Sequence, residues 1–168
     1  MRGFLPGVIA VLVLLLAACG FQPRGQAQLP PELAVLYIQS QTAIATPPGL
    51  VSRKLRTLLA SSGVTVVNDP AQATATLVVL RESDGRRAVS ADRFDVKREY
   101  ILAYDVSYEV RLGNGKVLLP AESLIANRAL LFDENQVLGF EAAQEALANS
   151  MAEDLAWQII RRLQALKS

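Results

Sequence analysis

One residue of this chain is placed for covalent chemistry. Cys19 follows Leu16, Ala17 and Ala18, and it is the only cysteine among 168 residues. A cysteine after two small residues at the end of an apolar run is typical of a bacterial lipobox, in which the thiol forms a thioether with diacylglycerol. The small residues let the backbone enter the signal peptidase. We therefore predict Cys19 as an N-acyl (palmitate), S-diacylglycerol cysteine; the alternative is a chance cysteine in an apolar helix.

The segment before Cys19 has the order of an export signal. Arg2 gives a basic start, and a mainly apolar run follows at 4–16. A transmembrane helix is the alternative, but it needs about 20 predominantly apolar residues, and this run ends too early. Gly20 is not the aspartate that resembles an inner-membrane retention signal. We therefore predict a lipid-anchored protein on the periplasmic side of the outer membrane.

The composition excludes several kinds of enzyme. The chain has no histidine, so a Ser-His-Asp triad, a Cys-His pair and the usual His-containing zinc sites are impossible. The lone cysteine excludes an internal disulfide. Paired carboxylates remain a route to acid–base catalysis, but the acidic residues are scattered over patterned strands and helices, where a solvated face explains them. We predict no enzyme, no catalytic residue, no cofactor and no metal site.

Removal of the signal leaves a neutral chain of one domain's length. The remaining 150 of 168 residues suffice for a single core. Loss of Arg2 leaves 16 of the 17 basic residues against 16 acidic ones, a balance that argues against nucleic-acid binding. We predict three parts, namely a signal peptide at 1–18, a lipidated N-terminus and tether at 19–31, and a single domain at 32–168.

Hydrophobic periodicity predicts the elements of the domain. Apolar runs and strict alternation predict strands at 33–38, 73–81, 100–112 and 116–131, and a brief extended piece at 64–67. Apolar residues at helical spacing predict helices at 51–62 and 140–166. Pro120 lacks an N–H, which places it at a bulge or on an edge.

The order of these elements predicts the fold class. Two long amphipathic helices and a set of half-buried strands predict an α+β two-layer sandwich. We expect two helices on one face of a roughly four-stranded, mixed, mainly antiparallel sheet. In the 100–112 strand the apolar residues share one face. The opposite, wet face carries Asp105, Ser107, Glu109 and Arg111.

Several short motifs together resemble the LptE family of lipopolysaccharide-assembly lipoproteins. Their order and spacing carry the resemblance: CGFQPRG at 19–25, a helix at 50–64, Glu99-Tyr100, RALLFD at 128–133 and the long final helix. The resemblance implies an outer-membrane lipoprotein that assists lipopolysaccharide assembly. It also implies two partners, an LptD-type β-barrel in which the domain sits as a plug, and lipopolysaccharide itself.

Lipopolysaccharide carries phosphates and acyl chains, so its recognition requires Arg or Lys beside apolar surface. The segment 81–98 offers such a mixture, and the pattern leaves open whether it is a hairpin or a loop. The residues singled out for lipopolysaccharide contact are Arg93, Arg86, Arg87 and Lys97. Arg93 is carried over from the resemblance, because it lies six positions before Glu99-Tyr100. A solvated segment of mixed charge is the other interpretation.

Trp157 lies nearly opposite the apolar stripe of the final helix. It is either a second packing contact, a chance exposed aromatic residue, or an anchor for a protein partner.

Two further hypotheses remain open. In one, the protein is a free, lipid-anchored, periplasmic-facing module that binds a small apolar ligand or lipid. In the other, it is a hydrolase acting through Glu99, Asp105 and Glu109, which the missing histidine weakens.

Overall fold

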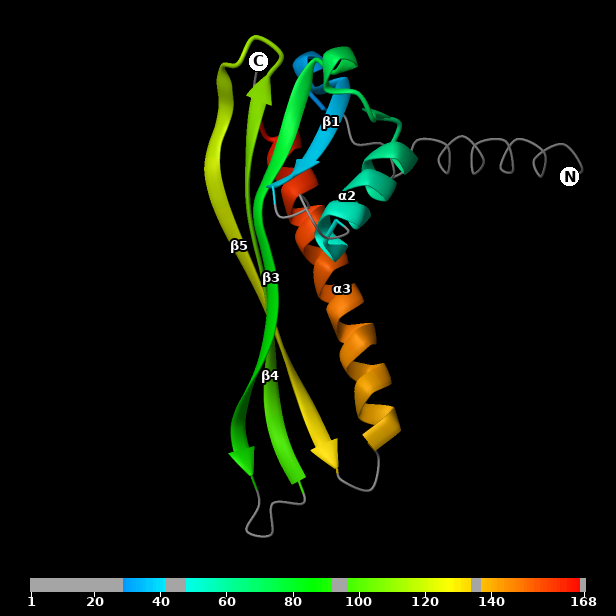
Figure 1. The fold of residues 1–168 in the computed structure, drawn as a ribbon, viewed down its shortest axis with the longest axis vertical. Coiled ribbons are helices and arrows are strands. Elements are labelled where there is room, and N and C mark those ends of the chain that lie inside the picture. Colours follow the sequence, from blue (N-terminus) through cyan, green and yellow to red (C-terminus); the bar gives the residue numbers. More distant parts are fainter. Residues whose placement is uncertain (1–28, 42–47, 92–96, 134–136, 167–168) are drawn as a thin grey trace, which may run out of the picture.

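The computed structural model describes residues 29–41, 48–91, 97–133 and 137–166, which form a two-layer α+β sandwich (Figure 1). The elements in chain order are the short turn η1 (Pro31–Leu33), β1 (Val35–Ser40), α2 (Leu50–Ser61), β2 (Thr65–Val67), the short turn η3 (Pro70–Gln72), β3 (Ala75–Ala91), β4 (Lys97–Leu112), β5 (Val117–Asp133) and α3 (Val137–Gln164). Both α-helices share one apolar core with the sheet. The prediction of an α+β sandwich with two helices is confirmed.

The sheet has five strands in the order β2-β1-β3-β4-β5, one more than the roughly four expected. The additional strand is the brief extended piece: β2 pairs in parallel with β1, with Val35 opposite Thr65. β1 also pairs in parallel with β3, whereas β3, β4 and β5 are antiparallel. Three residues are too few to show a period, which is why the sequence could not separate this strand from a turn.

The segment 81–98 is a hairpin. β3 continues ten residues beyond the predicted end of its strand, and it pairs with β4 as far as Ala91 opposite Arg98. The tip of this hairpin, 92–96, lies outside the described residues. The sequence pattern did not predict a strand in this polar part of β3. A hairpin that a single helix covers on one side needs few apolar residues, so the alternation is weak there.

Pro120 is both at a bulge and on an edge. The pairing of β4 with β5 moves from Tyr108 opposite Glu122 to Val110 opposite Leu119, so Pro120 is skipped. β5 is the last strand of the sheet, and a missing N–H is tolerated there.

Two glycines fix the ends of α2. Gly63 follows the helix with φ +87°, a conformation that closes a helix at low cost only with glycine. Gly49 precedes it, and a Cβ there would lie 2.1 Å from the carboxyl carbon of Glu82 on β3. A side chain at residue 49 would therefore displace the Glu82 carboxylate, which accepts hydrogen bonds from the first turn of α2.

The molecule is long, and its two ends differ (Figure 1). We call one end the head: β1, α2, β2, the strand segments 75–82, 104–112 and 117–126, and residues 151–164 of α3. The other end, the distal arm, comprises residues 83–91, 97–103, 127–133 and 137–150. Most of the fully buried side chains belong to the head, among them Leu36, Leu55, Leu77 and Leu155. None of the described helices is long and apolar enough to cross a membrane.

Candidate functional site

The distal arm carries an arginine held over aromatic rings. Tyr100, Phe132 and Phe140 come from β4, β5 and α3, and the Phe132 and Phe140 rings are edge to face with centroids 4.9 Å apart. The guanidinium carbon of Arg86 lies 5.7 Å from the Tyr100 ring centre and 5.8 Å from that of Phe140. Cation–π attraction holds the charge there while the residue stays exposed. The arm therefore presents a positive charge beside apolar surface.

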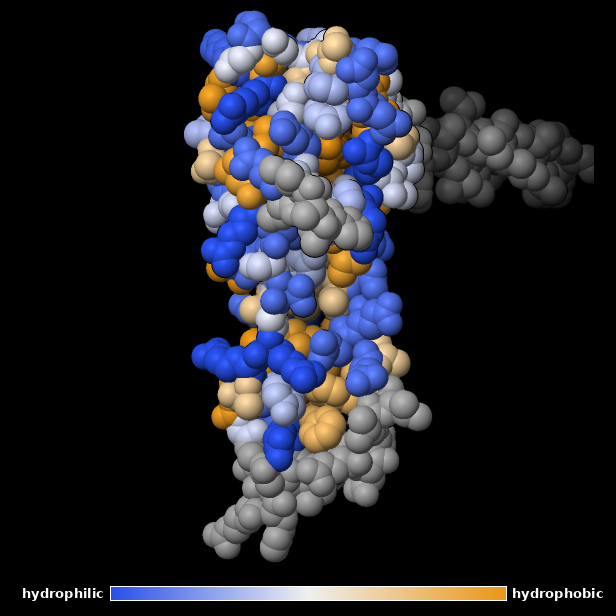
Figure 2. Space-filling view, in the orientation of Figure 1, coloured by the Kyte–Doolittle hydropathy of each residue, from blue (hydrophilic) through white to orange (hydrophobic). Residues whose placement is uncertain are grey.

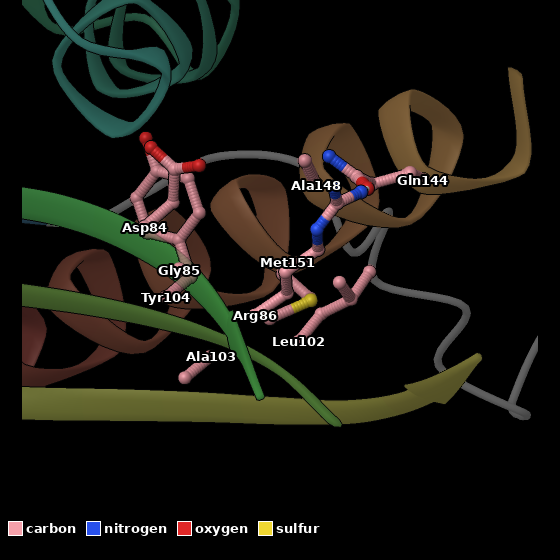
Figure 3. A pocket seen from close by; sticks show the side chains of 9 residues that line it. All are labelled: Asp84, Gly85, Arg86, Leu102, Ala103, Tyr104, Gln144, Ala148 and Met151. Atoms are coloured by element: carbon pink, nitrogen blue, oxygen red, sulfur yellow. The ribbon is translucent and has the colours of Figure 1, made fainter. Parts of the chain in front are cut away.

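A small pocket opens next to Arg86, between the sheet and α3 (Figure 3). Its volume is about 140 Å³. Leu102 and Met151 contribute apolar walls, and polar groups stand at the rim. Figure 3 shows Arg86 reaching from β3 toward α3, where its guanidinium donates a 2.8 Å hydrogen bond to Oε1 of Gln144.

The structure separates the residues singled out for lipopolysaccharide contact. Arg86 is opposite Leu102 and lies on the helix-covered face, whereas Arg87 is opposite Ile101 and lies on the other face, because successive strand residues alternate. The backbone of Lys97 pairs with Asp133 at the end of the hairpin. Hydrophilic and apolar residues lie side by side on the arm in Figure 2.

Two predicted residues, Arg93 and Cys19, lie outside the described part of the chain. Their roles stay predictions.

A buried tyrosine in the head joins the sheet to α2. The Tyr104 hydroxyl donates a 2.7 Å hydrogen bond to Glu82, and the same carboxylate accepts bonds from the backbone N–H of Val51 and from the hydroxyl of Ser52. Burial and the neighbouring Glu82 carboxylate raise the pKa of Tyr104 above its ordinary value. Glu82 thus caps the first turn of α2 through Val51, which lies 31 residues earlier in the chain.

A second buried tyrosine makes a similar connection to α3. The Tyr108 hydroxyl donates to Glu122 on β5 at 3.1 Å, and Arg162 on α3 donates two hydrogen bonds to Oε1 of that carboxylate, at 2.9 and 2.7 Å. Burial and Glu122 raise the pKa of Tyr108, while the Arg162 guanidinium lowers the pKa of Glu122. These two connections fix the helices on the head, so that α3 projects along the arm.

The sheet face opposite the helices is largely polar over β4. Asp105 and Ser107 alternate with the buried Tyr104 and Val106, as predicted. Glu109 is the exception to the predicted wet face, because it is buried. Arg111 covers it and donates a 2.6 Å hydrogen bond to its carboxylate.

Trp157 is half-buried and packs against the core, and it also lines a groove at the edge of β5. The packing interpretation therefore holds for part of its ring, and the rest faces the groove.

The sequence did not single out Phe132, Phe140 and Gln144, which surround Arg86. Phe132 is the penultimate residue of β5, and Phe140 lies in the first turn of α3. The two aromatic residues therefore flank the connection between β5 and α3. This placement was the feature of the sequence that could have indicated the two residues. The sequence does not show that residues of β4, β5 and α3 contact one another.

Within the described ranges, no group of three or more acidic residues is arranged to hold a metal ion. What the arm and the sheet face offer is contact chemistry: a cation beside apolar rings, and a polar surface free of helices.

The architecture defines a class of small α+β lipoprotein domains. A lipoprotein B from Nitrosomonas europaea superposes with a TM-score of 0.69 at 25% identity, covering 87% of this chain and 91% of that one. A minor lipoprotein from Acinetobacter baumannii has the same fold, with a TM-score of 0.63 at 22% identity over 79% of this chain and 92% of its own.

The chain belongs to the LptE family. The family model, described as lipopolysaccharide-assembly, matches residues 32–163. The LPS-assembly lipoprotein LptE of Yersinia enterocolitica is 32% identical over 162 residues, which cover 93% of this chain and 73% of the relative. Membership confirms the predicted resemblance and makes the protein an outer-membrane assembly lipoprotein rather than an enzyme.

Proposed function

We propose that the protein assists the assembly of lipopolysaccharide in the outer membrane as plug and partner of an LptD-type β-barrel. In this proposal, lipid on Cys19 holds it at the periplasmic face. The observation that carries the plug is the sheet face without helices, which is polar at Asp105 and Ser107 in the centre of β4 and carries the exposed Ile125 and Leu131 on β5. Large membrane barrels have polar interiors, which suit a polar face better than an apolar one.

The distal arm supports direct contact with lipopolysaccharide. The guanidinium of Arg86 provides a fixed charge for a phosphate, and the Tyr100 and Phe140 rings below it provide apolar surface for an acyl chain. Arg87 and Lys97 belong to the two strands of the same hairpin and add positive charge to it, and Arg93 lies between these strands in the sequence.

Native extraction in a mild detergent tests the partner. We expect the full-length, lipidated protein to co-purify with a large barrel protein. Ser107→Arg places a bulky cation on the outer sheet face and should reduce recovery of the barrel, because the added group separates the two surfaces. Thr57→Arg, on the exposed side of α2, is the matched control and should have no effect. Recovery of the wild-type protein free of any barrel would overturn the proposal.

Photocrosslinking in living cells tests the lipid contact. A photoreactive residue at Arg86 or Arg93 should give adducts that react with antibody to lipopolysaccharide, and one at Arg53 on α2 should not. Equal labelling at all three positions would mean that the arm is not a lipid site.

A free ligand-binding module is the weaker alternative. The pocket beside Arg86, at about 140 Å³, is smaller than the roughly 300–1,000 Å³ of ordinary small-molecule sites. Hydrogen exchange of the β4 amides with and without the barrel separates the two, because only a plug gains protection from the barrel.

A further inference from the structure

The outer edge of β5 is an unprotected strand edge. In the part of the chain that the structure describes, β5 pairs with β4 on one side only. From Ala121 to Asp133 it contains neither proline nor glycine. Exposed edges of this length present unpaired N–H and C=O groups, and proteins usually shorten, charge or cover them.

A groove runs along this edge beneath α3. Its floor comprises four consecutive residues of β5, 125–128, and its wall comprises Asp154, Trp157, Gln158 and Arg161 of α3. These four helical positions fall on one face of the helix, since their spacing is three, four and seven. The volume of the groove is about 310 Å³. A strand edge beside an overhanging helix is the arrangement in which some domains take an extended peptide as an added strand.

The exposed apolar side chains gather on the same strand. Among the described residues, four large apolar side chains are exposed, and three of them belong to β5: Val117 at 47%, Ile125 at 64% and Leu131 at 76%. Ile125 also lines the groove. These three side chains lie on the sheet face without helices, next to this edge, and their burial favours a protein partner on this side of the molecule.

The charge of the groove selects for an acidic partner residue. Asp154 already accepts a 2.7 Å hydrogen bond from Arg128, so these two charges compensate each other. Arg161 makes no ion pair within the described residues and leaves one net positive charge beside Trp157.

We propose that the groove between the β5 edge and α3 binds an extended segment of the barrel partner by strand addition, with an acidic side chain of that segment on Arg161. Backbone hydrogen bonds to β5 supply affinity, and Trp157 and Arg161 on α3 supply selectivity. This inference rests on the proposed function for the source of the segment. It goes further in naming the surface and the form of the ligand.

Variants of the groove test the proposal in the full-length, lipidated protein co-produced with the barrel. Gln158→Glu adds a negative charge to the α3 wall of the groove, and Arg161→Glu reverses the selecting charge. Each should lower affinity for the barrel at least about tenfold. Thr57→Glu and Arg53→Glu, both on the exposed side of α2, are the matched controls and should bind as the wild type does. Circular dichroism confirms that all four variants fold.

Hydrogen exchange distinguishes strand addition from a flat contact. In the wild-type complex, hydrogen exchange should slow at alternate amides of β5 between Glu122 and Asp133. These are the amides whose N–H groups point away from β4, because an added strand bonds every second residue. A complex that forms normally with all variants and leaves these amides unchanged overturns the groove proposal but leaves the plug proposal standing. If the wild-type protein forms no complex, the plug proposal itself fails. Slowing in protein without the barrel would point to a second copy of this chain instead, and would also overturn the proposal.

Discussion

The head and the distal arm are built from the same three long strands and the same helix, yet they bury their side chains differently. In the head, both helices cover the sheet, and Leu55, Leu77, Leu155 and Ile159 are fully buried. In the arm only α3 remains over β3, β4 and β5, and Tyr100 and Phe132 between them are partly exposed, whereas Phe140 is buried. The exposed Val89 and Leu131 also lie in the arm.

This difference separates stability from contact. Burial in the head supplies the free energy of folding, because each buried large apolar side chain contributes roughly 1.5–3 kcal/mol. The arm buries less and keeps charge and apolar surface exposed together, which is what a ligand requires. The following substitutions test the separation, from the largest expected loss of stability to the smallest.

Leu155→Ala should destabilise the head most. Leu155 is fully buried between α3 and the sheet, and its truncation leaves a cavity that costs about 3 kcal/mol. Urea denaturation measures this loss. Leu131→Ala in the arm is the control and should cost less than about 0.5 kcal/mol, because that side chain is already in solvent. Equal losses at the two positions would remove the distinction between head and arm.

Glu82→Ala should cost about 2 kcal/mol. It removes the acceptor of the Tyr104 hydroxyl and of the Val51 N–H, and both donors are then left without a partner. The free energy of unfolding measures the effect, and Asp84→Ala, an exposed residue two positions on, is the control. A loss no larger than that of Asp84→Ala would show that α2 does not depend on this carboxylate.

Tyr104→Phe and Tyr108→Phe should flatten the loss of stability in alkali. Burial and a neighbouring carboxylate raise the pKa of both tyrosines. Stability from a group whose folded pKa is raised is present below the unfolded pKa, about 10 for tyrosine, and is lost as pH rises above it. Denaturation at a series of pH values from 8 to 11, on the wild type and the double variant, measures this. Tyr100→Phe in the arm, whose ring is partly exposed, is the control, and its curve should follow the wild type.

Arg86→Gln should change stability by less than about 0.5 kcal/mol, because the side chain is exposed. It should nevertheless weaken binding of lipopolysaccharide to the purified, full-length protein several-fold, since it removes a charge held over two rings. Arg53→Gln on the head is the matched control for charge. If both variants bind lipopolysaccharide equally well, the arm has no special role in the contact.

Much of the fold could be predicted from patterns along the chain. The 3.6-residue period gave both helices, and alternation gave β4, because each of these elements has one buried face. The brief extended piece at 64–67 was predicted and is β2, but its place in the sheet was not predicted, nor was the far half of β3 as a strand. β2 is three residues long, and the far half of β3 is held by pairing with β4 rather than by an apolar face of its own.

The candidate site was predicted only in part. The sequence indicated a basic segment between two strands and included Arg86 in it. The sequence could not predict that Arg86 lies over Tyr100 and Phe140, or that Arg87 lies on the opposite face. Both depend on the register of the strands and on the return of α3 along the arm.

The sequence by itself predicted the export signal and the lipid on Cys19, and it determined the absence of histidine chemistry and the family. These depend on which residues are present and on their local order. Only the tertiary structure decided that Glu82 caps a helix from another element, that β5 has a free edge beside Trp157, and that charge and aromatic rings meet in the arm. The physical reason is that each of these depends on contacts between segments far apart in the chain, which packing of the core brings together.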